Sequence, residues 1–267
     1  MIYVILLLIL VFVYCTTFEK RGKPILYKNM HIEKLKHLDF DYFTDKVGDQ
    51  RIFVHRGKFN MVSTTMKEFY QQMVAGNDRD YLKSEDEYNL LGILGIKGEI
   101  INEFGKLFDK HVKNILGRDL GFWMGGKGTT TGWHTDIEDL NYLYLVKGKK
   151  RIMLISPIYN DCMYERKIFT AGAKWAEIDF KNIDHEKYPK FKDAKVHTYI
   201  MEKGDCILIP KKWWHCVVNL EDTIGFTYKA YRWDYFYYHV PPELLRRYWY
   251  MLKGFTIADK YQNLQYD

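Results

Sequence analysis

Residues 131 to 136 read Thr-Gly-Trp-His-Thr-Asp and place His134 and Asp136 two positions apart. In an extended strand, side chains at this spacing point to the same face, so both are able to reach one metal ion. A second stretch, residues 204 to 215, runs through an apolar segment, a proline and two tryptophans to His215. Two histidines and one carboxylate are ligands that suit a divalent transition metal and leave coordination positions open.

The His-x-Asp pair alone is a weak signal, because a surface turn or a structural histidine gives the same pattern. Its surroundings strengthen the metal interpretation. Glycines at 125, 126 and 128 precede the pair, and a strand-like apolar run follows at 142 to 146. Residues 147 to 150 then make a basic turn into a second apolar run at 151 to 157. This order of segments is more informative than the pair itself.

The order continues to residues 204 to 215 and resembles the JmjC and cupin-like family of Fe(II)/2-oxoglutarate oxygenases, especially its small protein-hydroxylase branch. The resemblance covers residues 38 to 240, the expected catalytic domain. It implies a mainly β fold with flanking α-helices, namely a double-stranded β-helix (jelly roll) with N-terminal and C-terminal helices. It also implies Fe(II) and 2-oxoglutarate as cofactors.

The resemblance assigns the iron ligands. His134, Asp136 and His215 stand at the matching positions. Such a facial set of two imidazoles and one carboxylate leaves room at the iron for the cosubstrate and oxygen.

Lys150 is the candidate for binding the far carboxylate of 2-oxoglutarate, at the position where similar hydroxylases carry a cosubstrate lysine. It shares strand parity with Ile152 and Leu154, so it points inward if they do. A buried ammonium needs a partner, and a bound dicarboxylate supplies one. The alternative is that residues 149 to 151 form a solvated hairpin tip.

Two further positions follow from the resemblance. Thr131 matches a threonine that binds the same carboxylate, and Asn141 matches an asparagine close to the cosubstrate and the metal. The pattern is broken at Thr227 and Lys229, where some relatives carry asparagine and tryptophan. This departure concerns the pocket wall and leaves the iron ligands unchanged.

The N-terminal segment, residues 1 to 18, carries no charged side chain and is just long enough to cross a bilayer as a helix. We expect a membrane anchor. A cleaved signal peptide is the alternative, although no basic segment precedes the apolar run and no small-x-small site ends it. Basic residues at 20 to 23 favour a cytoplasmic catalytic domain, with a lumenal orientation left open. Residues 19 to 37 are expected to be a linker.

Composition favours one large globular domain, because 47% of the 267 residues are hydrophobic and 17% are aromatic. The net charge of +6 comes from basic residues scattered along the chain, so nucleic acid is not an expected partner. The four cysteines indicate neither a disulfide framework nor a CxxC zinc site.

Two helices are expected before the strands. Residues 66 to 74 follow a threonine cap, with Glu68 at the capping-box position. Residues 99 to 116 carry apolar side chains at three- and four-residue steps, which predicts an amphipathic helix on the outside of the barrel. Residues 157 to 195 form a long insertion that we expect to contact the substrate. Strands are expected at 120–125, 141–147, 150–156, 196–202, 205–209, 215–220 and 223–231.

The C-terminal segment, residues 241 to 267, has apolar side chains at helical spacing and is expected to be helical. Related hydroxylases dimerise through a C-terminal pair of helices, so a homodimer is expected here.

The sequence therefore predicts a 2-oxoglutarate-dependent dioxygenase that hydroxylates a protein or peptide side chain, with succinate and CO2 as coproducts. Histone demethylation fits less well, because neither a chromatin-reading domain nor a basic tail accompanies the core in this sequence. The alternative is a non-catalytic cupin-like binding or structural protein with a vestigial metal site. A cupin enzyme without 2-oxoglutarate is disfavoured, since such sites usually use three histidines.

Overall fold

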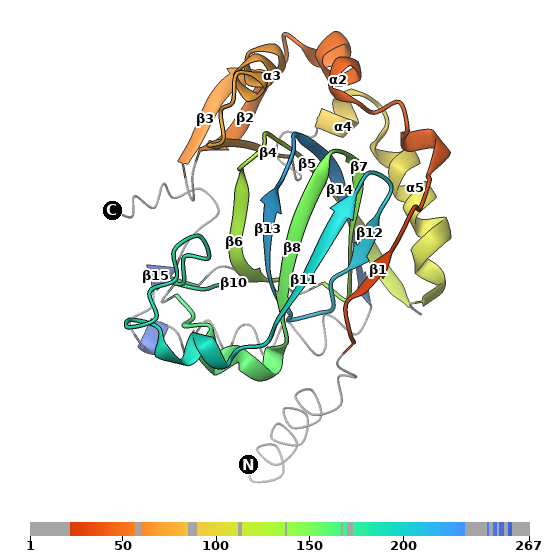
Figure 1. Ribbon diagram of the computed structural model, residues 1–267. Coiled ribbons are helices and arrows are strands. Elements are labelled where there is room, and N and C mark those ends of the chain that lie inside the picture. The colour runs from red at the N-terminus through yellow and green to blue at the C-terminus, as the bar shows by residue number, and fades with distance from the viewer. Residues whose placement is uncertain are drawn as a thin grey trace.

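Two antiparallel β-sheets face each other across an apolar interior and form a jelly roll (Figure 1). The interior cluster joins Leu143 and Ile207 of one sheet to Ile152 and Leu154 of the other. The expected mainly β fold is confirmed. The computed structural model describes residues 22–56, 60–84, 90–111, 114–136, 138–166, 168–169, 173–232, 245, 248–249, 251–253 and 256–257.

The larger sheet has the strand order β1-β12-β7-β14-β5-β4-β2-β3, and the smaller has the order β10-β6-β13-β8-β11. The strands of the larger sheet are β1 (Ile25–Tyr27), β12 (Cys206–Leu208), β7 (Leu140–Lys147), β14 (Thr223–Arg232), β5 (Ile115–Gly125), β4 (Asp80–Ser84), β2 (Arg51–Arg56) and β3 (Asn60–Thr65). Those of the smaller sheet are β10 (Lys174–Trp175), β6 (Thr130–Thr135), β13 (Trp214–Asn219), β8 (Lys149–Ile155) and β11 (Val196–Glu202). A separate parallel pair joins β9 (Ile168–Phe169) to β15 (Thr256–Ile257).

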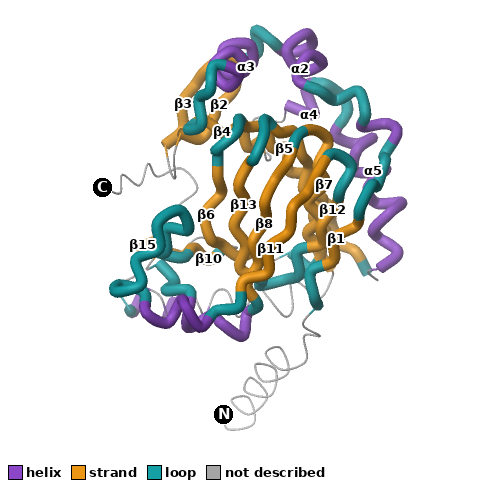
Figure 2. Tube along the Cα trace, viewed as in Figure 1, coloured by secondary structure: helices purple, strands orange, loops and turns teal. Residues whose placement is uncertain are grey.

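The helices gather in two places, as Figure 2 shows: the N-terminal ones beside the larger sheet, and the short ones of the insertion at the opposite end of the molecule. The N-terminal group comprises η1 (Glu33–Leu35), α2 (Phe40–Val47), α3 (Met66–Val74), α4 (Leu90–Ile93), α5 (Lys97–Phe108) and η2 (Asp109–His111). The insertion carries η3 (Pro157–Cys162) and η4 (Pro189–Asp193).

Helix α3 begins and ends where the sequence predicts. The Thr65 hydroxyl accepts from the Glu68 amide at 3.2 Å, and the Glu68 carboxylate accepts from the Thr65 amide at 3.1 Å. These reciprocal bonds satisfy two amides that a helix start otherwise leaves without partners.

Helix α5 is shorter than expected. It ends at Phe108, whereas the prediction extended it to residue 116. Asn114 adopts a left-handed φ of 60°, and the chain then enters β5, which pairs with β14 from Ile115 onward. Ile115 and its neighbour fit a helical stripe, but strand pairing with β14 decides their conformation. The expected position of the helix on the outside of the barrel is confirmed, because Phe104 packs against Tyr144 and Phe226.

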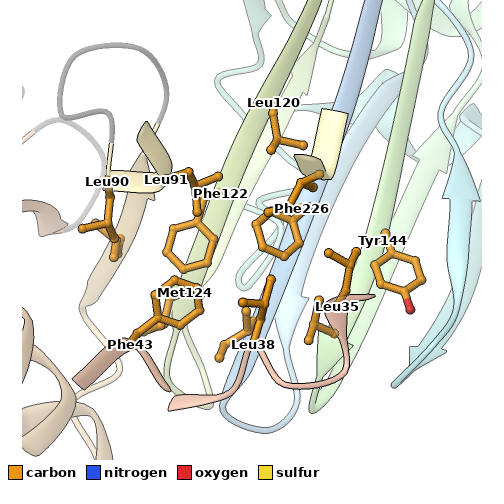
Figure 3. Packing of buried hydrophobic residues seen from close by; sticks show 14 of the residues in the cluster. Leu35, Leu38, Phe43, Leu90, Leu91, Leu120, Phe122, Met124, Tyr144 and Phe226 are labelled. Carbon is orange, nitrogen blue, oxygen red and sulfur yellow. The ribbon is translucent and has the colours of Figure 1, made fainter. Parts of the chain in front are cut away.

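The outer face of the larger sheet is covered by the N-terminal helices. Figure 3 shows Phe122 and Phe226 of this sheet beside Leu35, Leu38 and Phe43 from the N-terminal segment. On β14, Ile224, Phe226 and Tyr228 belong to this outer core. Since side chains alternate along a strand, the residues between them face the interior. The interior near β14 is therefore lined in part by polar side chains.

The linker prediction for residues 19 to 37 is wrong from residue 25 onward. Residues 25–27 form β1, which pairs with β12 from Ile25 opposite Leu208 to Tyr27 opposite Cys206. Leu35 is buried in the outer core, so this segment is part of the domain. A three-residue strand leaves too short a pattern to recognise, and its place depends on β12, far away in the sequence.

The predicted membrane anchor, residues 1 to 18, lies outside the described residues. Within the described ranges, no helix has both the length and the apolar character needed to cross a membrane. Most of the C-terminal segment also lies outside them. Where it is described, the Lys253 amide donates to the Trp249 carbonyl at 3.0 Å, as in a helix. The homodimer stays a prediction.

The insertion, residues 157 to 195, packs on the outer face of the smaller sheet. Its Phe191 and Ile178 join Trp133 and Trp214 in one buried cluster. Each of these tryptophans is the strand neighbour of a candidate ligand, so its side chain faces away from the candidate metal centre.

Candidate metal centre

Strands β6 and β13 place the two candidate histidines side by side. His134 and His215 are direct partners in the antiparallel register, and their ring centroids lie 4.0 Å apart. Asp136 follows the last residue of β6. The ligand atoms of these three residues all lie within 4.8 Å of one another. The structure thus brings together three residues that are widely separated in the sequence.

Each imidazole forms a hydrogen bond through Nδ1, which leaves Nε2 available to bind a metal ion. Nδ1 of His134 lies 2.8 Å from the Gly132 carbonyl oxygen, and Nδ1 of His215 lies 3.1 Å from that of Trp213. A carbonyl oxygen only accepts, so each Nδ1 carries the proton and donates. Each Nε2 then keeps its lone pair toward Asp136, at 3.9 Å from His134 and 3.4 Å from His215.

The charge states of His134 and Asp136 also suit metal binding. Burial lowers the pKa of His134 to about 3, and the nearby His215 adds to this effect. Burial works to raise the pKa of Asp136, but the neighbouring His215, Lys229 and His134 outweigh it and hold that pKa well below its usual value. A neutral His134 and an ionised Asp136 are the forms that bind a metal ion.

Asn141 fixes the carboxylate of Asp136. Its Nδ2 donates to Oδ2 of Asp136 at 2.7 Å. Asn141 is buried, and among the described residues nothing donates to its Oδ1. The predicted asparagine therefore lies beside a candidate ligand.

Lys150 is fully buried, with 1% of its surface exposed, so a solvated hairpin tip is excluded. It shares the inward face of β8 with Ile152 and Leu154, as the strand parity predicts. Burial lowers the pKa of its amine to about 7. Among the described residues no carboxylate pairs with it, and its polar contact is the Tyr81 hydroxyl at 3.3 Å.

Tyr81 connects Lys150 with Thr131. Its hydroxyl also lies near the Thr131 side chain, and its ring stacks on Trp123 with centroids 5.6 Å apart. This tyrosine was not predicted, because a single tyrosine on β4 carries no spacing signal. Three donors, Lys150, Tyr81 and Thr131, thus gather in one interior region.

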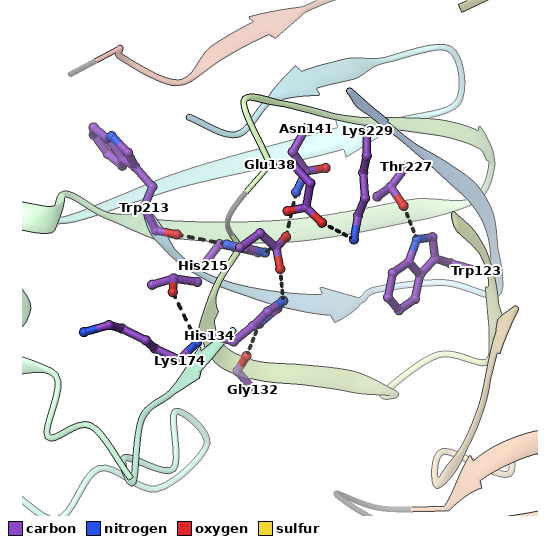
Figure 4. Close-up of polar contacts among 12 residues, drawn as sticks. Trp123, Gly132, His134, Glu138, Asn141, Lys174, Trp213, His215, Thr227 and Lys229 are labelled. Atoms are coloured by element: carbon purple, nitrogen blue, oxygen red, sulfur yellow. Dashed lines mark hydrogen bonds and ion pairs between the residues drawn. The ribbon is translucent and has the colours of Figure 1, made fainter. Parts of the chain in front are cut away.

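A buried ion pair forms another wall of the interior. Nζ of Lys229 lies 3.0 Å from Oε1 of Glu138, and the Tyr231 hydroxyl donates to the same oxygen at 3.3 Å. Burial, with the charge of Asp136, raises the pKa of Glu138. Figure 4 shows this pair beside Asn141. Lys229 is a position at which the chain departs from some relatives, and its role as a partner of Glu138 was not predicted.

Residues 27–243 match the cupin-like domain family. Because the match covers most of the chain, the protein belongs to this family, as the sequence resemblance predicts. The matched range begins in β1 and extends past the last strand of the larger sheet.

Several known proteins are similar to the chain, though distantly. tRNA wybutosine-synthesizing protein 5 of Gallus gallus is 26% identical over 244 residues, which cover 84% of this chain and 73% of that protein. Jumonji C domain-containing protein 5 of Drosophila melanogaster is 29% identical over 217 residues, or 73% of this chain and 51% of that protein. HSPB1-associated protein 1 of Homo sapiens is 25% identical over 173 residues, which cover 61% of this chain and 35% of that protein. The chain therefore spans about half of the Drosophila relative and about a third of the human one.

Proposed function

We propose that the protein is an Fe(II)- and 2-oxoglutarate-dependent dioxygenase that hydroxylates a protein side chain. The observation that carries this proposal is the convergence of His134, Asp136 and His215 within 4.8 Å. Two imidazoles with free Nε2 atoms and one carboxylate match the facial triad of non-heme Fe(II) enzymes. The JmjC names among the relatives support the same class.

The cosubstrate site is proposed around Lys150. A buried lysine without an acidic partner is costly, and a dicarboxylate bound there would supply the missing charge. The hydroxyls of Tyr81 and Thr131 add hydrogen-bonding groups for the same carboxylate. This grouping favours a site that binds 2-oxoglutarate over a site that binds only a metal ion and water, because the metal ion alone would give these three residues no role.

Each residue has a distinct task in this proposal. Fe(II) with 2-oxoglutarate and oxygen supplies the oxidation, which yields succinate, CO2 and the hydroxylated substrate. Gly132 and Trp213 hold the imidazoles through their carbonyl oxygens, and Asn141 orients the carboxylate of Asp136. Leu154, directly opposite His215 in the strand register, belongs to the apolar cluster between the two sheets.

A protein side chain is the proposed substrate. The name of the Gallus gallus relative refers to tRNA, so a nucleic acid is the main competitor. Binding phosphates requires lysines whose charge is available. Near the site, however, Lys211 is paired with Asp139 at 2.9 Å and Lys174 with Glu165 at 2.7 Å. This pairing supports a protein substrate over an RNA.

The proposal is tested by measuring succinate formed from 2-oxoglutarate with Fe(II), oxygen and ascorbate. We expect turnover by the wild-type protein and its loss in His134→Ala. The matched control is His185→Ala, which removes an exposed histidine of the insertion and leaves turnover unchanged. Equal succinate in wild type and His134→Ala would refute the proposal. Absence of both turnover and retained metal in the wild type would favour a vestigial cupin-like binding protein.

A further inference from the structure

The insertion contributes one aromatic side chain directly to the metal centre. Strand β10 adds to the edge of β6, with Trp175 opposite His134 and Lys174 opposite Thr135. The indole of Trp175 stacks on the imidazole of His134, with centroids 4.8 Å apart and 17° between the planes. No other described residue of the insertion contacts a candidate ligand by an aromatic ring.

The position of Trp175 is fixed from several sides. The Ala176 amide donates to the Trp133 carbonyl at 3.0 Å, and the Arg166 amide donates to the Trp175 carbonyl at 2.7 Å. Nε of Arg166 also donates to the Ala176 carbonyl at 3.0 Å. Ala176 itself is buried in the cluster of the insertion. The backbone that carries the indole is thus held by hydrogen bonds on both edges of β10.

His134 needs this support more than His215 does. The hydrogen bond from Nδ1 to Gly132 fixes the tautomer, but one bond leaves the imidazole plane free to tilt about that contact. His215 lies on β13, between β6 and β8, whereas beyond β6 only the two-residue β10 follows in the described sheet. A nearly parallel indole restricts the tilt and covers a face of the ring that would otherwise meet water.

We infer that Trp175 is a positioning residue that holds the His134 imidazole in the orientation required for metal binding. The inference rests on the proposed function, since it presumes that His134 binds the metal. It gives the insertion a role at the metal centre through a residue that touches the ligand and not the metal.

The test compares Trp175→Phe with Trp175→Leu, because both are apolar and only phenylalanine keeps a flat ring for stacking. The probe is Co(II), followed by its visible absorption spectrum and by calorimetric titration of the full-length protein. We expect Trp175→Leu to weaken Co(II) binding by about tenfold, in the range seen when residues that orient metal ligands are removed. It should also alter the Co(II) spectrum, whereas Trp175→Phe stays close to the wild type in both.

Phe180→Ala is the control for damage to the insertion, because Phe180 packs against the same outer cluster without contacting His134. It should lower the melting temperature and leave the Co(II) spectrum unchanged. Equal Co(II) binding by the leucine and phenylalanine variants, whether both normal or both weak, would overturn this inference and leave the proposed function standing. A wild-type protein that binds no Co(II) would instead refute the proposed function, and the inference would fall with it.

Discussion

His134 and His215 face each other as direct partners across β6 and β13, so the register of one strand pair decides whether a metal centre exists. Because side chains alternate along a strand, a slip by one residue would turn one imidazole to the outer face, where Trp133 and Trp214 now lie. The outer cluster and the metal centre therefore depend on the same register.

Asn141→Ala should weaken metal binding without unfolding the protein. The substitution removes the 2.7 Å hydrogen bond to Asp136 and leaves that carboxylate free to rotate. We expect a loss of about 10- to 100-fold in Mn(II) affinity, measured by calorimetric titration. The matched control is Asn219→Ala, which removes another buried asparagine bonded to Thr129 and should lower stability at unchanged Mn(II) affinity. Similar Mn(II) affinities for Asn141→Ala and the wild type would contradict the assigned role.

Lys150→Met should abolish binding of the 2-oxoglutarate mimic N-oxalylglycine and retain the metal. Methionine fills a similar volume but cannot pair with a carboxylate. We expect no saturable binding of N-oxalylglycine to the Mn(II)-loaded variant in calorimetry, whereas Mn(II) affinity changes by less than about threefold, because the lysine contacts no candidate ligand. Tight N-oxalylglycine binding by this variant would move the cosubstrate site elsewhere.

The same lysine should make the stability of the metal-free protein depend on pH. Burial lowers its pKa from 10.5 in the unfolded chain to about 7 in the folded protein. Between these values the unfolded chain binds more protons, so the stability of the wild type rises with pH. Lys150→Met lacks this contribution. In urea denaturation, Lys150→Met should therefore be more stable than the wild type at pH 7.5, and this difference in stability should shrink by pH 9.5. A difference that stays constant between the two pH values would rule out the neutral buried amine.

The Glu138–Lys229 pair should show strong coupling. Lys229→Met leaves a buried carboxylate without its cation, which typically costs about 3–5 kcal/mol of unfolding free energy. The double variant Glu138→Gln/Lys229→Met removes both charges and should recover much of that loss. Urea denaturation of the two single variants and the double variant measures this. Additive losses would show that the two side chains do not depend on each other.

Much of the fold follows from local pattern. The capping box of α3 is contained in a few adjacent residues, and its prediction is confirmed at both ends of the helix. The inward face of Lys150 follows from strand parity, since Ile152 and Leu154 are apolar neighbours on the same side. The three candidate metal ligands could be named because the His-x-Asp pair and the later histidine have recognisable flanking segments.

The remaining features depend on contacts between distant segments. Strand β1 exists because β12 offers an edge, and the end of α5 is set by β5 pairing with β14. Tyr81, Trp175 and the Glu138–Lys229 pair have no characteristic spacing, so only the assembled sheets show them near the site. Their roles at the metal centre could not be predicted from sequence alone.

The most direct test of the central claim is anomalous X-ray scattering from crystals soaked with Mn(II) and N-oxalylglycine. The account predicts one manganese peak within bonding distance of Nε2 of His134, Nε2 of His215 and a carboxylate oxygen of Asp136. The mimic should reach from that ion toward Lys150. A peak located elsewhere, or no peak between the three side chains at saturating Mn(II), would contradict the account.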